Sequence, residues 1–243
     1  MRIGLALVLL AAAIACGRGL FRHYEYEEEM YLSLDGSATI DLNSSVPALN
    51  ALRGASFDER PTAPVDRAAV REYFSTPVTR VTRVSASRRN NRRFIHVRIE
   101  VDDVSRLGEA APFAWSSYQF TNSGDVVNYR QTIGGAAGKP VEQVRWTGEE
   151  IVAFRLHIPS RIVFHNAGAN NPQRGNILAW EQPLAARLEG TPLMLDARMD
   201  PQSILYGTLL LFGGTFVAVA VMFALLVWWM LRTGAAPGLS AKG

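Results

Sequence analysis

Hydrophobic and polar residues alternate in several stretches of the chain, and a period of two predicts half-buried β-strands. Residues 24–34 place tyrosine, methionine and leucine side chains on one face and glutamates on the other. Asp35 and Gly36 follow, a pair typical of the type I′ hairpin turn, in which both central residues have positive φ. The alternation resumes in residues 38–42, so we expect the first two strands to pair.

Three consecutive glutamates occupy residues 27–29. A cation site would need their carboxylates to converge, but successive residues of a strand point to opposite faces of the sheet. We therefore expect this run to form a solvated edge of the sheet rather than a cation site.

Two short helices are predicted after the second strand. Ser45 is placed to cap the first helix, which Gly54 ends, and Asp66 is placed to cap the second, which ends before Pro77. Further strands are expected at residues 78–84, 94–101, 114–120, 126–133, 151–158, 162–164, 177–180 and 193–199, with a short helix at 184–188. The pattern as a whole predicts an α+β domain of about ten mostly antiparallel strands with three or four short helices.

An apolar stretch covers residues 204–231 and contains no charged side chain. At about 1.5 Å per residue a helix of this length exceeds the ~30 Å hydrocarbon core of a bilayer, so it predicts one C-terminal transmembrane helix. Tyr206, Trp228 and Trp229 lie near its two ends, where aromatic residues favour the membrane interfaces. Arg232 follows the stretch.

The first residues have the pattern of an export signal. Residues 1–15 contain Arg2, a short apolar core and small residues before a cut, so we assign them as a signal peptide. The sequence AIAC resembles the lipobox of bacterial lipoproteins, which makes Cys16 a candidate for lipidation. Ordinary cleavage and an uncleaved signal anchor are the alternatives. Cys16 is also the one cysteine of the chain, which excludes an intrachain disulfide.

These two segments predict a single-pass protein of the bacterial cytoplasmic membrane. Residues 16–203 form the extracytoplasmic domain and residues 232–243 the cytoplasmic tail, in keeping with the positive charges of the tail. The membrane is then the first partner, through the helix and possible acylation of Cys16. Gly214 and Ala218 are spaced to let a second helix approach closely, so a homo-oligomer formed through the helix is a hypothesis.

The charge of the predicted domain is balanced. Three of the 25 positively charged residues lie outside residues 17–203, whereas all 22 acidic residues lie inside. A neutral domain gives no basis for sequence-independent binding of nucleic acid. Arg88, Arg89, Arg92 and Arg93 nevertheless gather at one predicted hairpin tip, where they could contact anionic lipid headgroups or an envelope polyanion. A solvated turn is the alternative.

Residues 160–183 combine amide side chains with aromatic rings, a composition that suits a loop binding sugars or polar headgroups. It equally suits a loop that satisfies its own backbone. The candidate ligand residues are Asn166, Asn170, Asn171, Asn176 and Trp180.

Catalytic motifs are not found in the sequence. His157 and His165 with Glu181 are the best metal candidates, but their spacing matches no known ligand motif. The glycine-rich residues 134–138 lack the lysine and serine of a phosphate-binding loop. We therefore expect no catalytic residues, no metal and no cofactor.

The order of features resembles that of bacterial LppM-type domain proteins. The shared features are the signal with AIAC, the opening YLSLDGSATIDL at residues 31–42, a following pair of helices, later hairpins and one C-terminal span. The resemblance implies an exported, membrane-tethered α+β domain facing the cell envelope, with lipid or glycolipid binding and no assigned catalytic residues.

Two functions from different classes follow. The first is a noncatalytic binding or scaffold module for a lipid, glycan or protein next to the membrane. The alternative is an extracytoplasmic metal-dependent hydrolase that uses His157 and His165 with neighbouring carboxylates.

Overall fold

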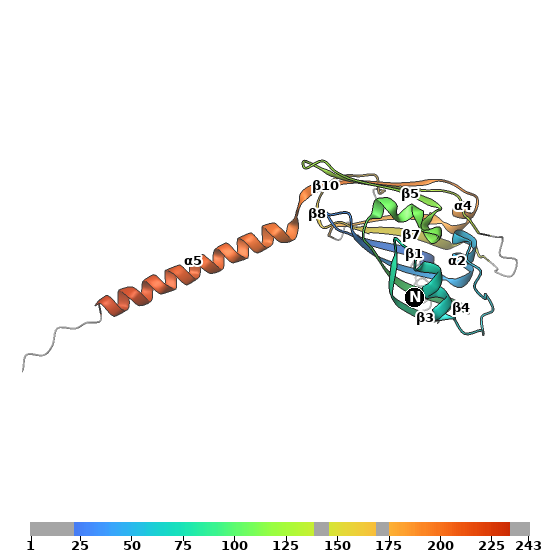
Figure 1. Ribbon diagram of the computed structural model, residues 1–243, viewed down its shortest axis with the longest axis horizontal. Coiled ribbons are helices and arrows are strands. Elements are labelled where there is room, and N and C mark those ends of the chain that lie inside the picture. Colours follow the sequence, from blue (N-terminus) through green and yellow to red (C-terminus); the bar gives the residue numbers. More distant parts are fainter. Residues whose placement is uncertain (1–21, 139–145, 169–174, 234–243) are drawn as a thin grey trace, which may run out of the picture. The chain divides into compact units, whose positions relative to one another are not determined.

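The computed structural model describes residues 22–138, 146–168 and 175–233. The chain divides into two compact units, residues 1–201 and residues 202–243, each of which is described by itself. The first unit contains two β-sheets with short helices at their margins, and the second contains one long helix (Figure 1).

The larger sheet has six strands in the order β3-β4-β2-β1-β7-β9. Its strands are β1 (His23–Leu32), β2 (Ala38–Ser45), β3 (Arg80–Arg89), β4 (Arg92–Val101), β7 (Glu150–His157) and β9 (Ile177–Pro183). Strand β1 pairs in parallel with β7, and the other neighbours pair antiparallel. The first two strands therefore pair as the sequence predicted, and β1 lies in the interior of the sheet.

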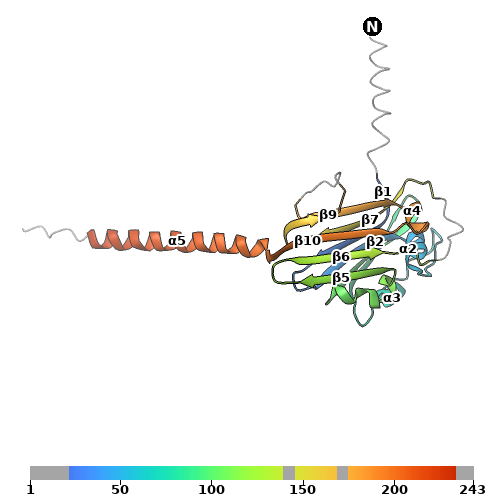
Figure 2. The same ribbon diagram turned by 90° about the horizontal axis from the view of Figure 1, so that it is seen from above.

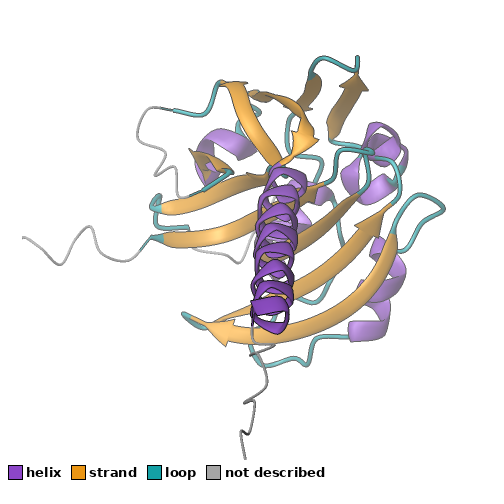
Figure 3. Ribbon diagram, turned by 90° about the vertical axis from the view of Figure 1, so that its left-hand side faces the viewer, coloured by secondary structure: helices purple, strands orange, loops and turns teal. Residues whose placement is uncertain are grey.

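The smaller sheet has four strands in the order β5-β6-β10-β8. They are β5 (Ser116–Asn122), β6 (Val127–Ile133), β8 (Ser160–His165) and β10 (Leu193–Ser203). Figure 2 shows β5, β6 and β10 lying across β1, β2 and β7. The strands bend along their length (Figure 3), and the buried side chains of the two sheets meet in one core. The predicted α+β class with about ten mostly antiparallel strands is confirmed.

The described part of the domain contains three short α-helices, as predicted. They are α2 (Val46–Arg53), α3 (Arg67–Phe74) and α4 (Leu184–Leu188), and two 3₁₀ turns, η1 (Val104–Glu109) and η2 (Ala111–Phe113), accompany them. The Ser45 hydroxyl accepts a hydrogen bond from the Ala48 N–H at 3.2 Å, and Asp66 accepts from two N–H groups of α3. Gly54 ends α2 with a φ of 69°. The three predicted cap positions are therefore confirmed.

One turn differs from its sequence prediction. Only Gly36, at φ 88°, has a positive φ in the turn between β1 and β2, whereas Asp35 does not. The Ser33 N–H donates to the Ser37 carbonyl at 2.9 Å, so the loop is wider than a two-residue type I′ turn. The type I′ prediction for Asp35 and Gly36 is wrong. Positive φ at both central positions occurs instead at Asn90 and Asn91, between β3 and β4.

The second unit contains helix α5 (Ile204–Thr233), the one helix in the described residues that is long and apolar enough to cross a membrane. It begins at the predicted residue and continues two residues past the predicted end at 231. Strand β10 continues through Pro201 to Ser203, beyond the predicted end of the strand at residue 199. The predicted signal peptide, Cys16 and the tail from residue 234 onward lie outside the described residues.

The glutamate run does not form a solvated edge. Strand β1 lies between β2 and β7, and Glu28 shares the core-facing side of the strand with Tyr26 and Met30, where it is 2 % exposed. Its carboxylate forms an ion pair with Arg53 of α2, whose side chain is fully buried. Tyr26 donates a hydrogen bond to Glu28 Oε2 at 2.7 Å and accepts one from Arg53 Nε at 2.7 Å.

Aromatic rings enclose this buried pair. The Arg53 guanidinium lies 4.6 Å from the centre of the Phe113 ring, 4.9 Å from that of Trp115 and 5.1 Å from that of Tyr26. Burial raises the pKa of Tyr26 well above its ordinary value, so its hydroxyl stays protonated as a donor to Glu28. The arrangement ties β1, α2 and η2 together at one polar point inside the core.

Candidate functional site

A groove of about 570 Å³ lies on the outer face of the six-stranded sheet. It crosses β1, β2, β4 and β3, and we call it the outer groove. Its lining residues are Glu27, Glu29, Asp41, Leu42, Asn43, Arg83, Ser85, Ala86, Ser87, His96, Val97 and Arg98. Most of them are polar, because they are the strand residues that alternate with the core residues.

The strand register arranges these polar side chains in rows. In the first row, Glu27 lies opposite Asn43, Asn43 opposite His96, and His96 opposite Ser85. Asn43 Nδ2 donates to Glu27 Oε2 at 2.9 Å, while the buried Asn43 Oδ1 accepts no hydrogen bond. His96 Nε2 lies 2.8 Å from the Ser87 hydroxyl. The row therefore contains an acceptor that is unused and covered from solvent.

The second row runs from Glu29 through Asp41 and Arg98 to Arg83. Arg98 binds both carboxylate oxygens of Asp41, at 2.7 and 2.6 Å. The Arg83 side chain is exposed and makes no hydrogen bond or ion pair with any other described residue. A paired charge thus sits beside a guanidinium whose donors are all available.

Strand β7 extends the acidic end of the groove. Arg155 Nη1 lies 2.6 Å from Glu27 and 3.3 Å from Glu29, so one guanidinium contacts two carboxylates. His157 Nε2 lies 3.6 Å from Glu29. The neighbouring imidazole lowers the pKa of Glu29, which keeps that carboxylate charged in the groove.

An aromatic surface flanks this end of the groove. The Tyr31 ring stacks on the His157 ring with centroids 4.0 Å apart and planes inclined by 20°. The Tyr31 hydroxyl donates to Glu29 Oε2 at 3.2 Å, and the residue is 39 % exposed. The pair presents a fixed ring face beside carboxylate, amide and guanidinium groups.

The groove gives the domain a pH dependence that can be measured. Burial, with the nearby Arg89, lowers the pKa of His96 below its ordinary value of 6.5. The unfolded chain therefore binds more protons than the folded one just below that pH, and acidification favours unfolding. We expect the unfolding temperature of the full chain in detergent to fall when the pH is lowered from about 7.5 to about 5.5. The fall should be smaller in His96→Asn. An identical fall in both proteins would contradict this assignment.

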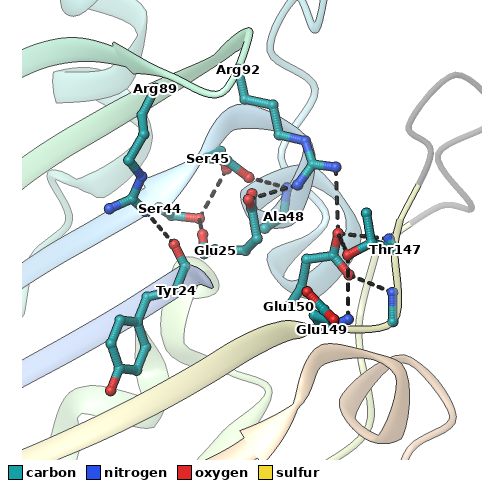
Figure 4. Close-up of polar contacts among 11 residues, drawn as sticks. Tyr24, Glu25, Ser44, Ser45, Ala48, Arg89, Arg92, Thr147, Glu149 and Glu150 are labelled. Carbon is teal, nitrogen blue, oxygen red and sulfur yellow. Dashed lines mark hydrogen bonds and ion pairs between the residues drawn. The ribbon is translucent and has the colours of Figure 1, made fainter. Parts of the chain in front are cut away.

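The predicted arginine cluster lies at the turn between β3 and β4, where Arg92 joins two buried glutamates (Figure 4). Arg92 Nη1 donates to Glu25 Oε1 at 2.6 Å, and Nη2 lies 3.5 Å from Glu150 Oε1. Burial acts to raise the pKa of Glu150, but hydrogen bonds from Thr147 and Gly148 outweigh it and lower the pKa. Arg92 therefore fastens the hairpin to β1 and β7.

Two other arginines of the cluster also bind the fold itself. Arg89 donates to the Tyr24 carbonyl and lies 4.3 Å from the Phe94 ring centre, and the buried Arg93 donates to the Asp58 carbonyl. Arg88 is exposed and donates to Asn91 within the turn at 2.7 Å. Headgroup binding by the set stays a prediction.

The described members of the predicted ligand loop bind other parts of the chain. Asn166 Oδ1 accepts from Trp180 Nε1 at 3.0 Å and from the Asp196 N–H at 2.9 Å. Asn176 Nδ2 donates to the Ser160 carbonyl at 2.8 Å. Trp180 is buried, and Asn170 and Asn171 lie outside the described residues. Ligand binding by this loop stays a prediction.

The histidines of the hydrolase alternative lie on different sheets, His157 on β7 and His165 on β8. Within residues 22–138, 146–168 and 175–233, no group of three or more His, Cys, Asp and Glu side chains could hold a metal ion. Glu181, the third candidate, forms an ion pair with Arg22 and accepts from Tyr24 at 2.7 Å. These positions give the hydrolase alternative no support.

Sequence reasoning did not identify the outer groove. Its signal was present, because alternation in four strands leaves polar residues such as Glu27, Asn43 and His96 on one side. The sequence does not state which strands are neighbours or in which register they pair. Those two facts bring the polar residues together.

Comparisons with known proteins do not assign this chain to a family. No family model matches the sequence, and no curated protein is similar to it. Among solved structures, the chain is similar to the folded domain of LppM from Mycobacterium tuberculosis, determined by NMR, with a TM-score of 0.39 and 10 % identity. The match covers 74 % of this chain and 92 % of that domain. The expected weak resemblance to LppM-type domains is confirmed, and similarity at this level says nothing about ligand or activity.

Proposed function

We propose that this protein is a membrane-tethered, noncatalytic binding module of a bacterial cell envelope, and that its outer groove binds a glycan. The apolar helix α5 supports the tether. The outer groove supports the binding role, and the exposed, unpaired Arg83 guanidinium among its polar side chains is the observation on which the proposal rests.

The chemistry of the groove favours a hydroxylated ligand. A sugar hydroxyl both donates and accepts, so it can accept from the Arg83 guanidinium and donate to a carboxylate such as that of Glu29. The groove carries three carboxylates, and the guanidinium groups of Arg83, Arg98 and Arg155 match them in number, so a neutral ligand meets no large uncompensated field. A lipid chain is disfavoured, because only Leu42, Ala86 and Val97 among the lining residues are apolar.

The size and the aromatic flank fit the same ligand class. A volume of about 570 Å³ lies in the range of about 300–1,000 Å³ typical of pockets for small ligands. Sugar rings carry C–H groups on their faces, and these pack on exposed aromatic rings such as Tyr31 on its His157 support. A short oligosaccharide can therefore lie along the rows from Tyr31 toward Arg83.

The proposal predicts which substitutions weaken binding. Isothermal titration of the detergent-solubilised full chain with a panel of neutral trisaccharides should find at least one that binds. We expect Tyr31→Ala and Asn43→Leu each to raise its Kd by about tenfold, a loss of about 1.4 kcal/mol.

The matched control is Thr132→Ala, an exposed residue on the outer face of the four-stranded sheet, which should bind as the wild type does. Absence of binding to every trisaccharide, or equal Kd values for the wild type and both groove variants, would remove the glycan proposal.

A further inference from the structure

A second, smaller hollow of about 200 Å³ lies on the outer face of the four-stranded sheet. We call it the arginine pocket, and its lining residues are Gln119, Thr121, Asn128, Arg130, Asp196 and Arg198. The register forms two rows, with Gln119 opposite Arg130 and Arg130 opposite Asp196, then Thr121 opposite Asn128 and Asn128 opposite Arg198. Arg130 and Arg198 are therefore diagonal neighbours, roughly 7–8 Å apart at their backbones.

Both arginines are held in place by contacts that leave donors free. Arg130 Nη2 donates to Asp196 Oδ2 at 2.7 Å, and Asp196 is itself mostly buried. The Arg198 guanidinium lies 5.0 Å from the centre of the Phe164 ring. Arg198 has no carboxylate partner among the described residues. A stacked guanidinium keeps its planar edge available for an acceptor.

The remaining groups of the pocket are neutral. Asn128 Nδ2 lies 3.4 Å from the Thr121 hydroxyl, and Gln119 adds another amide. Two guanidinium groups against one carboxylate leave the pocket with a net positive charge. Forked N–H donors and neutral amides together match an oxyanion, and especially the several oxygens of a phosphate group.

We propose that the arginine pocket binds a phosphate group, at a site separate from the outer groove. A hollow of about 200 Å³ is too small for most small-molecule ligands, but it accommodates one phosphate with part of its substituent. The phosphate can belong to a lipid headgroup or to a free phosphorylated compound. Both sources present the same oxygens to Arg130 and Arg198.

Two measurements on the full chain distinguish these sources. The first titrates inorganic phosphate into the detergent-solubilised protein by isothermal titration, with chloride as the reference anion. The second measures cosedimentation of the protein, held in phosphatidylcholine nanodiscs, with vesicles containing phosphatidylglycerol. Binding in both experiments assigns the site to lipid headgroups, and binding of phosphate alone assigns it to a free phosphorylated compound.

We expect Arg198→Gln and Arg130→Gln to weaken phosphate binding by at least tenfold. Arg198→Lys keeps the charge but loses the fork and the stacking on Phe164, so it should weaken binding by a smaller factor. Arg67 is an exposed residue of α3, and Arg67→Gln, the matched control, should bind as the wild type does.

Circular dichroism of each variant checks that the fold is retained. The proposal is overturned if the wild type binds phosphate no better than chloride. Equal affinity of wild type and Arg198→Gln would overturn it as well, as would an equal loss in Arg67→Gln. The binding variants of the glycan titration, Tyr31→Ala and Asn43→Leu, lie on the six-stranded sheet and not in the arginine pocket. Either proposal can therefore fail alone.

Discussion

Glu28→Ala should destabilise the domain by about 3–5 kcal/mol, because it leaves the Arg53 guanidinium charged and buried without a carboxylate. The low polarity of the core makes an unpaired charge far more costly than a lost surface contact. Urea unfolding of the detergent-solubilised full chain, followed by tryptophan fluorescence, measures the change. Trp115 packs 4.9 Å from the Arg53 guanidinium, so the fluorescence reports on this region.

A double substitution measures how strongly Glu28 and Arg53 stabilise each other. Glu28→Met combined with Arg53→Met removes both charges and keeps the volume, so its loss of stability should be smaller than the sum of the two single losses by about 2 kcal/mol or more. Tyr26→Phe is the control for the hydroxyl alone and should cost about 1 kcal/mol. Additive losses in the double variant would show that the pair does not act as a unit.

Much of the fold follows from local patterns in the sequence. The caps at Ser45 and Asp66 and the stop at Gly54 depend on neighbours within one helical turn, so the sequence alone predicts them. The strands follow from alternation, and the membrane helix from length and composition. Each of these signals is contained in a short stretch of chain.

The errors about buried charged residues arise where distant segments meet. The sequence of β1 does not reveal that β7, more than a hundred residues later, pairs with it in parallel and removes it from the edge of the sheet. From the sequence alone, Glu28 is therefore predicted to be solvated, because its partner Arg53 of α2 lies far away in the sequence. The arginine hairpin is a similar case, because the acceptors of Arg92 are two glutamates from other strands.

The candidate sites depend on the same long-range pairing. Alternation indicates that Asn43 and His96 share a polar face with many other residues, but only the register of β2 and β4 makes them neighbours. The arginine pocket likewise requires Arg130 of β6 and Arg198 of β10 to be diagonal. Neither pair has a spacing in the sequence that a motif could describe.

Gly138→Ala should also destabilise the domain strongly, because the end of the glycine-rich loop packs directly on the backbone of α2. A Cβ atom at residue 138 would lie 1.9 Å from the Asn50 carbonyl oxygen and 2.3 Å from that of Ala51. The loop would have to move away and lose two hydrogen bonds, from the Ala137 N–H to Leu52 at 3.0 Å and from the Gly138 N–H to Ala51 at 2.9 Å. We expect a loss of about 2–4 kcal/mol in the same urea experiment.

Gly135→Ala in the same loop is the matched control. A Cβ atom at residue 135 would meet only the Gly190 Cα, at an ordinary contact distance of 3.7 Å, so its stability should change by no more than about 0.5 kcal/mol. Similar losses in both variants would mean that loop flexibility, rather than close packing on α2, determines the effect. A loss confined to Gly138→Ala explains why the sequence needs glycine there: the last carbonyls of α2 take their donors from this loop, which leaves no room for a side chain.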